Sequence, residues 1–285
     1  MLVPVVFATE KFNALSNNMK FGIVGYGNLG KAVAAALIKS GDVTAQDICV
    51  CDKTETALSL AEKEHFRVYT TDEINGLISC SDVICLVVKG YVFEELSKVI
   101  DKQALKGKLV ISFMAGVTIE KISSLIDIGV GGDIGNGGIC DSGCDIARAM
   151  PSLAIAKNEG VIAYTKIPAK VASIFSKFGF AFEVEEENIE KVTAFASCGL
   201  GFAAYLIDTF KEAGQAMDFP PDTAALIAAL TFKNACDSGD FRNTVKAVAT
   251  PGGATEQGIN HMDACDVHGI VAQAMQKAYK SLESK

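Results

Sequence analysis

The sequence has no excess of positive charge and no long uninterrupted apolar run. Its formal net charge is −8 over 285 residues, which argues against sequence-independent binding to nucleic acid phosphates. No apolar run approaches the ~20 residues that span a bilayer. The apolar stretch Leu2–Phe7 is short and lacks the basic leader of a secretory signal. We therefore expect a soluble cytoplasmic protein that binds neither nucleic acid nor membrane.

The sequence also lacks the residue spacing of a metal site. Its nine cysteines are an odd number scattered along the chain. Cys140 and Cys144 have no second pair and no histidine nearby, so we predict no metal site. Reduced thiols in the cytosol account for this cysteine pattern. The three histidines have no obvious partner in the sequence and do not predict an acid–base pair.

Strands and helices alternate over the first half of the chain. Helical spacing of apolar residues predicts helices over Asn28–Lys39 and around Glu55–Lys63, and a further helix start at Thr71. Short, continuous apolar runs are typical of buried parallel strands. They predict strands at Lys20–Gly25, Asp47–Cys51, Arg67–Tyr69, Asp82–Val88 and Lys108–Phe113, with Ala149–Pro151 and Val161–Tyr164 as the last strands.

The character of the chain changes near Ala169. Alanine-rich helices are expected over Ile189–Gly214, Asp222–Ser238 and Met262–Lys285, with no further strand. We predict an extension over residues 1–18, a dinucleotide-binding domain over 19–168 and an all-helical domain over 169–285. The glycine-rich stretch Gly129–Gly143 is expected to be a mobile loop. The helical domain is predicted to complete its core in a homodimer.

A glycine motif joins the first strand to the first helix. Gly25-Tyr26-Gly27-Asn28-Leu29-Gly30 fits G-x-G-x-x-G, in which the glycines allow a tight turn, close approach of a diphosphate and helix–strand packing. An acidic residue, Asp52, directly follows the second strand about 20 residues later, where a ribose ligand is expected. The context predicts a Rossmann domain that binds a nicotinamide dinucleotide on the helix N-terminus.

The choice between NAD and NADP stays open at this point. Asp52 would accept hydrogen bonds from both ribose hydroxyls and repel a 2′-phosphate, which favours NAD. Lys53 beside it would neutralise a 2′-phosphate, which favours NADP.

A second candidate site lies in the helical half, at Thr250-Pro251-Gly252-Gly253-Ala254-Thr255. Two glycines expose backbone amides, and Thr255 places a hydroxyl at the start of the next helix. Such a turn can hold a small carboxylate and hydrogen-bond a neighbouring polar atom. An ordinary helix-capping turn is the alternative interpretation.

From residue 20 onward the chain resembles the pyrroline-5-carboxylate reductases. The resemblance is carried by FGIVGYGNLGKA (Phe21–Ala32), LVVKG (Leu86–Gly90), ISFMAGV (Ile111–Val117), RAMPS (Arg148–Ser152) and TPGGAT (Thr250–Thr255). TPGGAT is the most specific of these segments. The frame Thr193–Gly214 also follows the family's long helix without a gap.

The resemblance implies a Rossmann domain followed by a helical domain that interlocks in a homodimer or a ring of dimers. It implies proline biosynthesis: hydride transfer from NADPH or NADH to the C=N carbon of 1-pyrroline-5-carboxylate, giving L-proline. The amides of Gly252, Gly253 and Ala254 would bind the substrate carboxylate. Thr255 would be the catalytic residue, hydrogen-bonded to the ring nitrogen. The cofactor would be lined by Val88, Lys89, Ala115 and Gly116.

Several positions depart from the family pattern. Gly90 replaces a proline, and Ala196–Phe202 lacks the family's proline and tyrosine. Ser152 and Leu153 stand where asparagine and threonine are usual, and Glu256 adds a negative charge beside Thr255. Two alternatives therefore stay open. One is a related reductase of another cyclic imino acid or a β-hydroxyacid, and the other is a catalytically silent dinucleotide-binding protein.

Overall fold

Short, buried apolar segments form a single eight-stranded sheet in the order β3-β2-β1-β4-β5-β6-β7-β8. The computed structural model describes residues 19–127 and 143–283. All neighbouring strands run parallel except β6 and β7, which pair antiparallel. The strands are β1 (Phe21–Val24), β2 (Ile48–Cys51), β3 (Arg67–Tyr69), β4 (Val83–Leu86), β5 (Leu109–Ser112), β6 (Asp145–Pro151), β7 (Gly160–Tyr164) and β8 (Gly179–Glu183).

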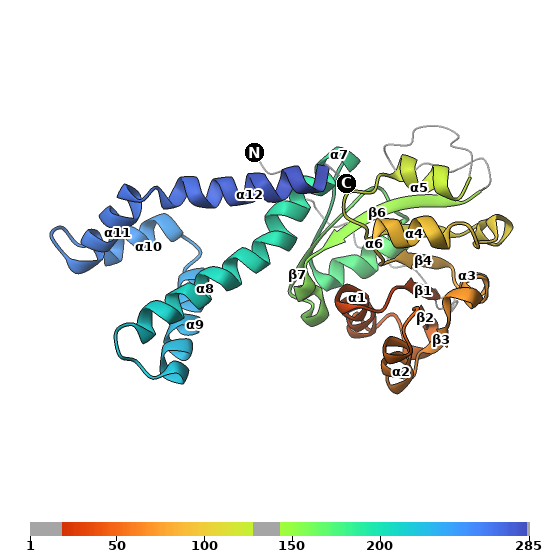
Figure 1. Ribbon diagram of the computed structural model, residues 1–285, viewed down its shortest axis with the longest axis horizontal. Helices are drawn as coiled ribbons and strands as arrows, with labels where there is room; N and C mark the ends of the chain where they lie inside the picture. The colour runs from red at the N-terminus through yellow and green to blue at the C-terminus, as the bar shows by residue number, and fades with distance from the viewer. Residues whose placement is uncertain (1–18, 128–142, 284–285) are drawn as a thin grey trace.

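Helices cover both faces of this sheet (Figure 1). One apolar cluster packs Leu37 of α1 with Phe175 of α6, and a second packs Phe93 of α4 with Ile122 of α5. Burial on both faces explains why the strands read as continuous apolar runs. The covering helices are α1 (Asn28–Lys39), α2 (Glu55–Lys63), α3 (Ile74–Cys80), α4 (Gly90–Leu96), α5 (Ile119–Leu125) and α6 (Ala169–Phe175).

The rest of the chain is an arm of helices that extends away from the sheet domain (Figure 1). A continuous 30-residue helix, Glu186–Gln215, leads outward and comprises α7 (Glu186–Val192), a π-helical segment (Thr193–Cys198) and α8 (Gly199–Gln215). It is followed by α9 (Pro221–Asp237), α10 (Phe241–Val248), α11 (Ala254–Ala264) and α12 (Val267–Glu283). α12 returns to pack against the π-helical segment and α7.

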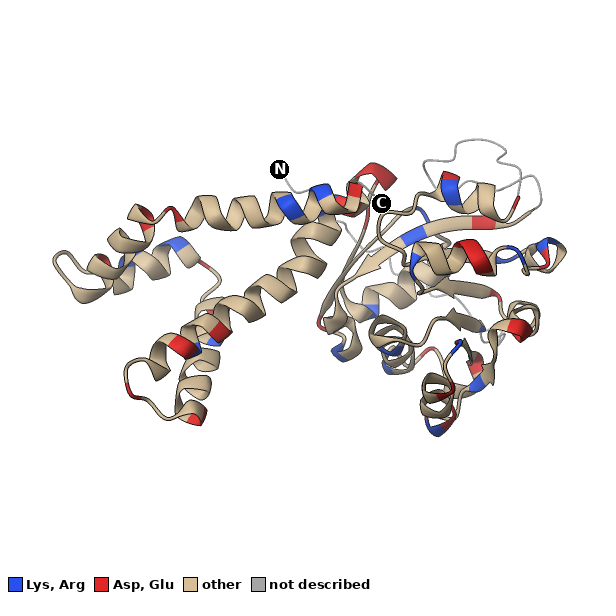
Figure 2. Cartoon of the chain, viewed as in Figure 1, with Lys and Arg blue, Asp and Glu red and all other residues tan. Residues whose placement is uncertain are grey.

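The arm carries few charges along α8 and α12 (Figure 2), and large apolar side chains are exposed on it. Tyr205, Leu226 and Phe241 are 73%, 61% and 64% exposed. Thr193–Phe210 contains a single charged residue, Asp208. Among the described residues, only Glu186–Gln215 is long and apolar enough to cross a membrane by length and composition. The expectation that no such segment exists is therefore wrong.

The predicted fold class, a parallel Rossmann-type sheet followed by a helical domain, is confirmed. Several details differ. A strand does follow Ala169, because β8 pairs in parallel with β7, so the sheet extends beyond the predicted boundary at residue 168. The expected helix Met262–Lys285 is interrupted at Asp266, whose positive φ of 53° ends α11 and lets α12 begin. The short helices α4, α5, α6 and α10 were not predicted.

Two predictions concern residues outside the described part of the chain. The extension at residues 1–18 lies wholly outside it, and so does the loop predicted at Gly129–Gly143 apart from Gly143 itself.

Candidate active site

The glycine turn lies between the buried strand β1 and helix α1, and steric crowding fixes two of its glycines. Gly25 has φ +100°, and a Cβ there would lie 2.5 Å from the Val87 carbonyl oxygen. A Cβ on Gly30 would lie 2.0 Å from the Gly25 carbonyl oxygen. Because both neighbours are backbone atoms, neither can move aside as a side chain would. Glycine is therefore required at both positions.

The middle glycine faces open space. A Cβ on Gly27 would meet no atom within 4 Å, and Gly27 is the N-cap of α1 without a side-chain cap. The first N–H groups of the helix have no intrahelical acceptor, and Asn28 beside them is exposed. Open space beside unpaired amides, at the positive end of a 12-residue helix, fits a dinucleotide diphosphate.

Asp52 holds the glycine turn in place. One carboxylate oxygen accepts the Tyr26 N–H at 2.8 Å, and the other accepts the Thr54 N–H and hydroxyl at 2.9 and 2.8 Å. The sequence predicted Asp52 as a ribose ligand, and the structure adds this anchoring role. Lys53 beside it is exposed.

Tyr26 contributes to the turn through its backbone rather than its phenol. Its ring is buried and meets Phe66 edge-on, with ring centroids 6.1 Å apart. Burial, and to a lesser degree the charge of Glu64, raise the pKa of Tyr26 to about 12. The side chain is therefore a core residue, and we do not assign it a contact with the cofactor.

The ends of β4 and β5 bring the other predicted cofactor residues to the same edge of the sheet. Val88 follows β4 and crowds Gly25, because its Cγ1 would lie 2.8 Å from a Cβ there. Lys89 is exposed at the start of α4, and Ala115 is half-buried in the turn after β5. In the sheet, β1 lies between β2 and β4, so the order of the strands changes direction at β1. A dinucleotide usually binds at such a switch point, beyond the carboxyl ends of the strands.

Gly116 is connected to the helical arm. Its N–H donates to Glu190 of α7 at 2.8 Å, and the neighbouring Ile119 N–H donates to Glu186 at 2.7 Å. Both carboxylates also bind the buried guanidinium of Arg148 on β6, which donates further to the Met114 carbonyl. Gly116 can still line the cofactor, but its N–H is already bonded to Glu190.

We call Arg148, Glu186 and Glu190 the buried ion cluster. Sequence reasoning did not assign it, although an arginine flanked by apolar residues was its visible signal. The Arg148 side chain is 2% exposed, and those of Glu186 and Glu190 are 18% and 13% exposed. Charges so deeply buried require partners. The cluster therefore joins the turn after β5 to the first helix of the arm.

The π-helical segment meets the end of β6. Ser197 donates its hydroxyl to the Pro151 carbonyl at 2.9 Å. Ser152, which stands where the family has asparagine, is buried and accepts the Val161 N–H at 3.1 Å. Its hydroxyl therefore stabilises the connection between β6 and β7. The next residue, Leu153, is 49% exposed. A π-helical turn often marks a functional site.

The turn Thr250–Thr255 joins α10 to α11, and two of its three proposed carboxylate-binding amides already have acceptors. The Gly252 N–H donates to Glu256 at 2.8 Å, and the Gly253 N–H donates to the Thr250 carbonyl at 2.9 Å. Ala254 and Thr255 are exposed in the first turn of α11. The amides available to a ligand are therefore those of Ala254 and Thr255 rather than those of the glycines.

Within one chain the two predicted sites are not brought together. The glycine turn lies on the sheet domain, whereas α10 and α11 form the far end of the arm (Figure 1). The arm's extended shape therefore keeps the two predicted sites apart within one chain.

Two family models match separate parts of the chain. The model for NADP oxidoreductase, coenzyme F420-dependent, matches residues 20–116. The model for pyrroline-5-carboxylate reductase dimerisation matches residues 186–284. The second model begins where the arm leaves the sheet domain.

Whole-chain comparisons agree with these two matches. The pyrroline-5-carboxylate reductase of Aquifex aeolicus is 27% identical, with 93% of this chain and 97% of that protein covered. Pyrroline-5-carboxylate reductase 2 of Dictyostelium discoideum is 27% identical, with 94% of each covered. The structure of Plasmodium falciparum pyrroline carboxylate reductase with NADP bound has a TM-score of 0.78 at 20% identity, covering 94% of this chain and 98% of that one.

The dinucleotide fold, its intact phosphate-binding turn and the helical arm together define a two-domain oxidoreductase that uses a nicotinamide dinucleotide, NAD(P). Its relatives narrow this class further. The chain is similar to the pyrroline-5-carboxylate reductases over both of its domains.

Proposed function

We propose that the protein reduces 1-pyrroline-5-carboxylate to L-proline with NADPH or NADH. One observation carries the proposal: relatives with this activity in their names align over both domains, with 93% of this chain and 97% of the first relative covered. The alignment therefore includes the cofactor turn and the turn before α11. The bound cofactor would supply the hydride, and the protein would supply orientation and a hydrogen bond where charge changes.

The cofactor would lie along the edge formed by the ends of β1, β4 and β5. The first-turn amides of α1 would bind its diphosphate, since Gly27 leaves room beside them. We propose NADP(H) as the preferred form. Both carboxylate oxygens of Asp52 have partners within the chain, and Lys53 is exposed next to them without an ion pair among the described residues.

The imine substrate would bind at the start of α11. We propose that the amides of Ala254 and Thr255 hold its carboxylate, helped by the positive end of the 11-residue helix. The Thr255 hydroxyl would hydrogen-bond the ring nitrogen. In this arrangement the chain provides no covalent nucleophile. Its contribution is to bind and orient the C=N bond.

A second copy of the chain would complete the active site. The glycine turn lies in the sheet domain, whereas the turn before α11 lies at the far end of the arm (Figure 1). Exposed apolar side chains such as Leu226 and Phe241 leave the arm without an intramolecular partner for them. The arm matches a family model named for dimerisation. We propose a homodimer in which the arm of one subunit reaches the cofactor edge of the other. A ring of such dimers is a possible higher assembly.

The same dimer would cover the apolar helix Glu186–Gln215. Only 11% of its most apolar window is buried within one chain, and an unpaired helix of this kind requires either lipid or protein around it. The family model for dimerisation begins at Glu186 and includes the whole helix. We therefore propose a soluble, cytoplasmic protein.

Glu256 favours one alternative substrate class. Its carboxylate occupies the Gly252 N–H at 2.8 Å, in the turn where a substrate carboxylate is proposed to bind. An anion already present there would disfavour a second one. This contact favours a cyclic imine without a carboxylate, or with the carboxylate placed differently, as the second candidate substrate.

A steady-state comparison separates these substrates. Oxidation of NADPH and NADH would be followed with 1-pyrroline-5-carboxylate, with its six-membered homologue and with carboxylate-free 1-pyrroline. We expect the highest kcat/KM for 1-pyrroline-5-carboxylate with NADPH. Turnover of 1-pyrroline alone would support the second candidate. Cofactor binding without turnover of any of these imines, or of a β-hydroxyacid, would mean a silent dinucleotide-binding protein.

The role of Thr255 is tested by the Thr255→Ala variant. Losing one polar contact of ~1.4–2.7 kcal/mol should reduce kcat/KM by about 10–100-fold. The matched control is Thr209→Ala, because the Thr209 hydroxyl bonds only the Tyr205 carbonyl of its own helix. Wild-type activity in the Thr255 variant would remove this residue from the mechanism.

A further inference from the structure

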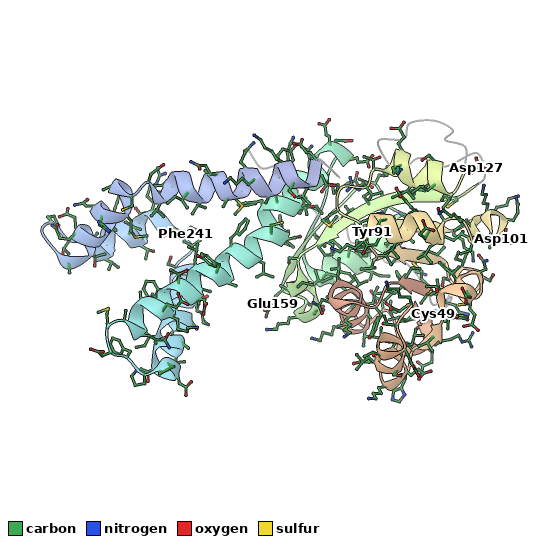
Figure 3. The ribbon with its side chains drawn as sticks, viewed as in Figure 1. Cys49, Tyr91, Asp101, Asp127, Glu159 and Phe241 are labelled. Carbon is green, nitrogen blue, oxygen red and sulfur yellow. The ribbon has the colours of Figure 1, made fainter. Side chains whose placement is uncertain are left out.

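Two cysteines of the sheet domain face each other across the boundary between a strand and a helix. Cys49 lies on β2 and Cys80 ends α3, and their Sγ atoms are 3.0 Å apart although the residues are 31 positions apart in sequence. Both are free thiols. Cys49 lies in the sheet domain, away from the helical arm (Figure 3). Neither was assigned a role by the sequence or by the proposed reaction.

The surroundings of Cys80 are polar on one side. The Tyr69 hydroxyl donates to its Sγ at 3.5 Å. Tyr69 reaches it by crossing α3 at Gly76, where a Cβ would lie 2.8 Å from the ring. Gly76 and Cys80 are one helical turn apart and share a face of α3. Arg67, on the same strand as Tyr69, adds a positive charge nearby.

The two thiols differ in exposure and in acidity. Cys49 is 6% exposed, whereas Cys80 is half-buried and accessible. Burial raises the pKa of Cys80, but hydrogen bonds from Tyr69, Cys49 and Ser81 together with the charge of Arg67 outweigh it, so the net pKa is lowered. Burial and the contact with Cys80 raise the pKa of Cys49 to about 12. Cys80 is therefore the thiol that forms the thiolate more readily.

We propose that Cys49 and Cys80 are a thiol modification site at which a hydroperoxide closes a disulfide between β2 and α3. The Cys80 thiolate attacks the peroxide, the O–O bond breaks, and Cys80 becomes a sulfenic acid while an alcohol or water leaves. The Cys49 sulfur then attacks the Cys80 sulfur. The S–O bond breaks, and water leaves with the Cys49 proton. The two thiols are oxidised and the hydroperoxide is reduced, so atoms and electrons balance.

This site is separate from the proposed active site. Cys49 is the second residue of β2, whereas Asp52 and the glycine turn lie beyond the opposite end of that strand. The disulfide would join α3 to the sheet without passing through the cofactor edge. We therefore expect the oxidised protein to gain stability and to keep its reductase activity.

The test uses the full-length protein, reduced and then treated with hydrogen peroxide. Peptide mass spectrometry under non-reducing conditions should find a Cys49–Cys80 cross-link that has lost two hydrogens. The melting temperature should rise by about 5–10 °C and return on reduction, because the cross-link restricts the unfolded chain. Finding the exposed thiols Cys236 and Cys265 oxidised while Cys49 and Cys80 remain reduced would overturn the proposal.

Variants test the order of the steps. In Cys49→Ser, a dimedone adduct should accumulate on Cys80, because its sulfenic acid has no second thiol to attack it. In Cys80→Ser, Cys49 should stay reduced, since burial protects it. Tyr69→Phe should slow cross-linking several-fold at pH 7 by raising the pKa of Cys80. Equal oxidation rates for Cys49 and Cys80 in the two serine variants would contradict the assigned roles. Because the wild-type cross-link is mapped independently, an unstable variant leaves the main result intact.

Discussion

Gly27 and Gly30 belong to one motif, but the absence of a side chain has a different consequence at each position. Gly30 is packed against the Gly25 carbonyl, so its missing side chain allows α1 to approach β1. Gly27 borders empty space and has an ordinary φ of −75°, so its missing side chain leaves room for the proposed cofactor. The first is a folding requirement, and the second is a proposed binding requirement.

Alanine variants should separate these two requirements. Gly30→Ala places a methyl group against backbone and should reduce the free energy of unfolding by about 1–3 kcal/mol. Gly27→Ala should leave the melting temperature nearly unchanged and weaken NADPH binding by about tenfold, or ~1.4 kcal/mol. Thermal melts and calorimetric titration with NADPH measure both. Unaltered NADPH affinity in a folded Gly27→Ala protein would mean that the diphosphate binds elsewhere.

Asp52 is the second residue at which the structure changes the interpretation. Its carboxylate accepts the Tyr26 N–H and two donors of Thr54, so removing it should loosen the glycine turn. The Asp52→Ala variant should weaken NADH and NADPH binding by similar factors, about tenfold each. Asp42→Ala is the matched control, because Asp42 forms an exposed ion pair with Lys177. A selective loss of NADH affinity would identify Asp52 as the ribose ligand instead.

At the scale of elements, the buried ion cluster joins β6, the turn after β5 and helix α7. Glu190 takes part in two contacts at once, with Arg148 and with the Gly116 N–H. Helix α7 therefore acts on the cofactor edge through Gly116, although Glu190 itself is a positioning residue. The π-helical segment that follows connects the same helix to Pro151.

Without the Glu190 carboxylate, the buried positive charge of Arg148 is paired only with Glu186. Glu190→Ala should cost about 3–5 kcal/mol of unfolding free energy and raise KM for NADPH more than it lowers kcat. Glu190→Gln keeps an acceptor for Gly116 and should restore much of the KM, which a purely structural role would not predict. The control is Glu187→Ala, since Glu187 is exposed on the same helix. Melting curves and steady-state kinetics give both readouts.

At the scale of the whole molecule, the proposed active site would need two chains to bring the glycine turn and Thr255 together. Leu226→Asp places a charge on an exposed apolar face of α9 and should shift the protein to monomers that bind NADPH but have no reductase activity. Light scattering and steady-state assays measure these outcomes. Full activity in a monomer would contradict the shared site.

Mixed dimers provide a sharper test of the same arrangement. Subunits carrying Gly27→Trp would be combined with subunits carrying Thr255→Ala, each of which alone should keep at most about a tenth of the wild-type activity. If each site takes its cofactor turn from one chain and Thr255 from the other, a mixed dimer has one intact site and about half of the wild-type activity. Sites built within single chains would give no recovery, because each would carry one defect.

Much of the fold was predictable because its signals are local. The bounds of α1 and α2 follow from helical spacing between recognisable ends, and β1, β2, β4 and β5 follow from short apolar runs. The missed strand β8 has only half-buried and exposed residues at the edge of the sheet, so it lacks that apolar signal. The break at Asp266 was missed because it depends on one residue adopting a positive φ.

The sequence by itself determined the turn at Gly25, Gly27 and Gly30 and the kind of cofactor it holds, because steric limits on a few consecutive residues leave few other conformations. Only the tertiary structure decided the partners of Gly116 and Arg148, which lie 74 and 42 positions from Glu190. It also decided that Thr255 lies far from the turn of its own chain. Contacts across such separations depend on how whole elements pack, and no local pattern of residues encodes them.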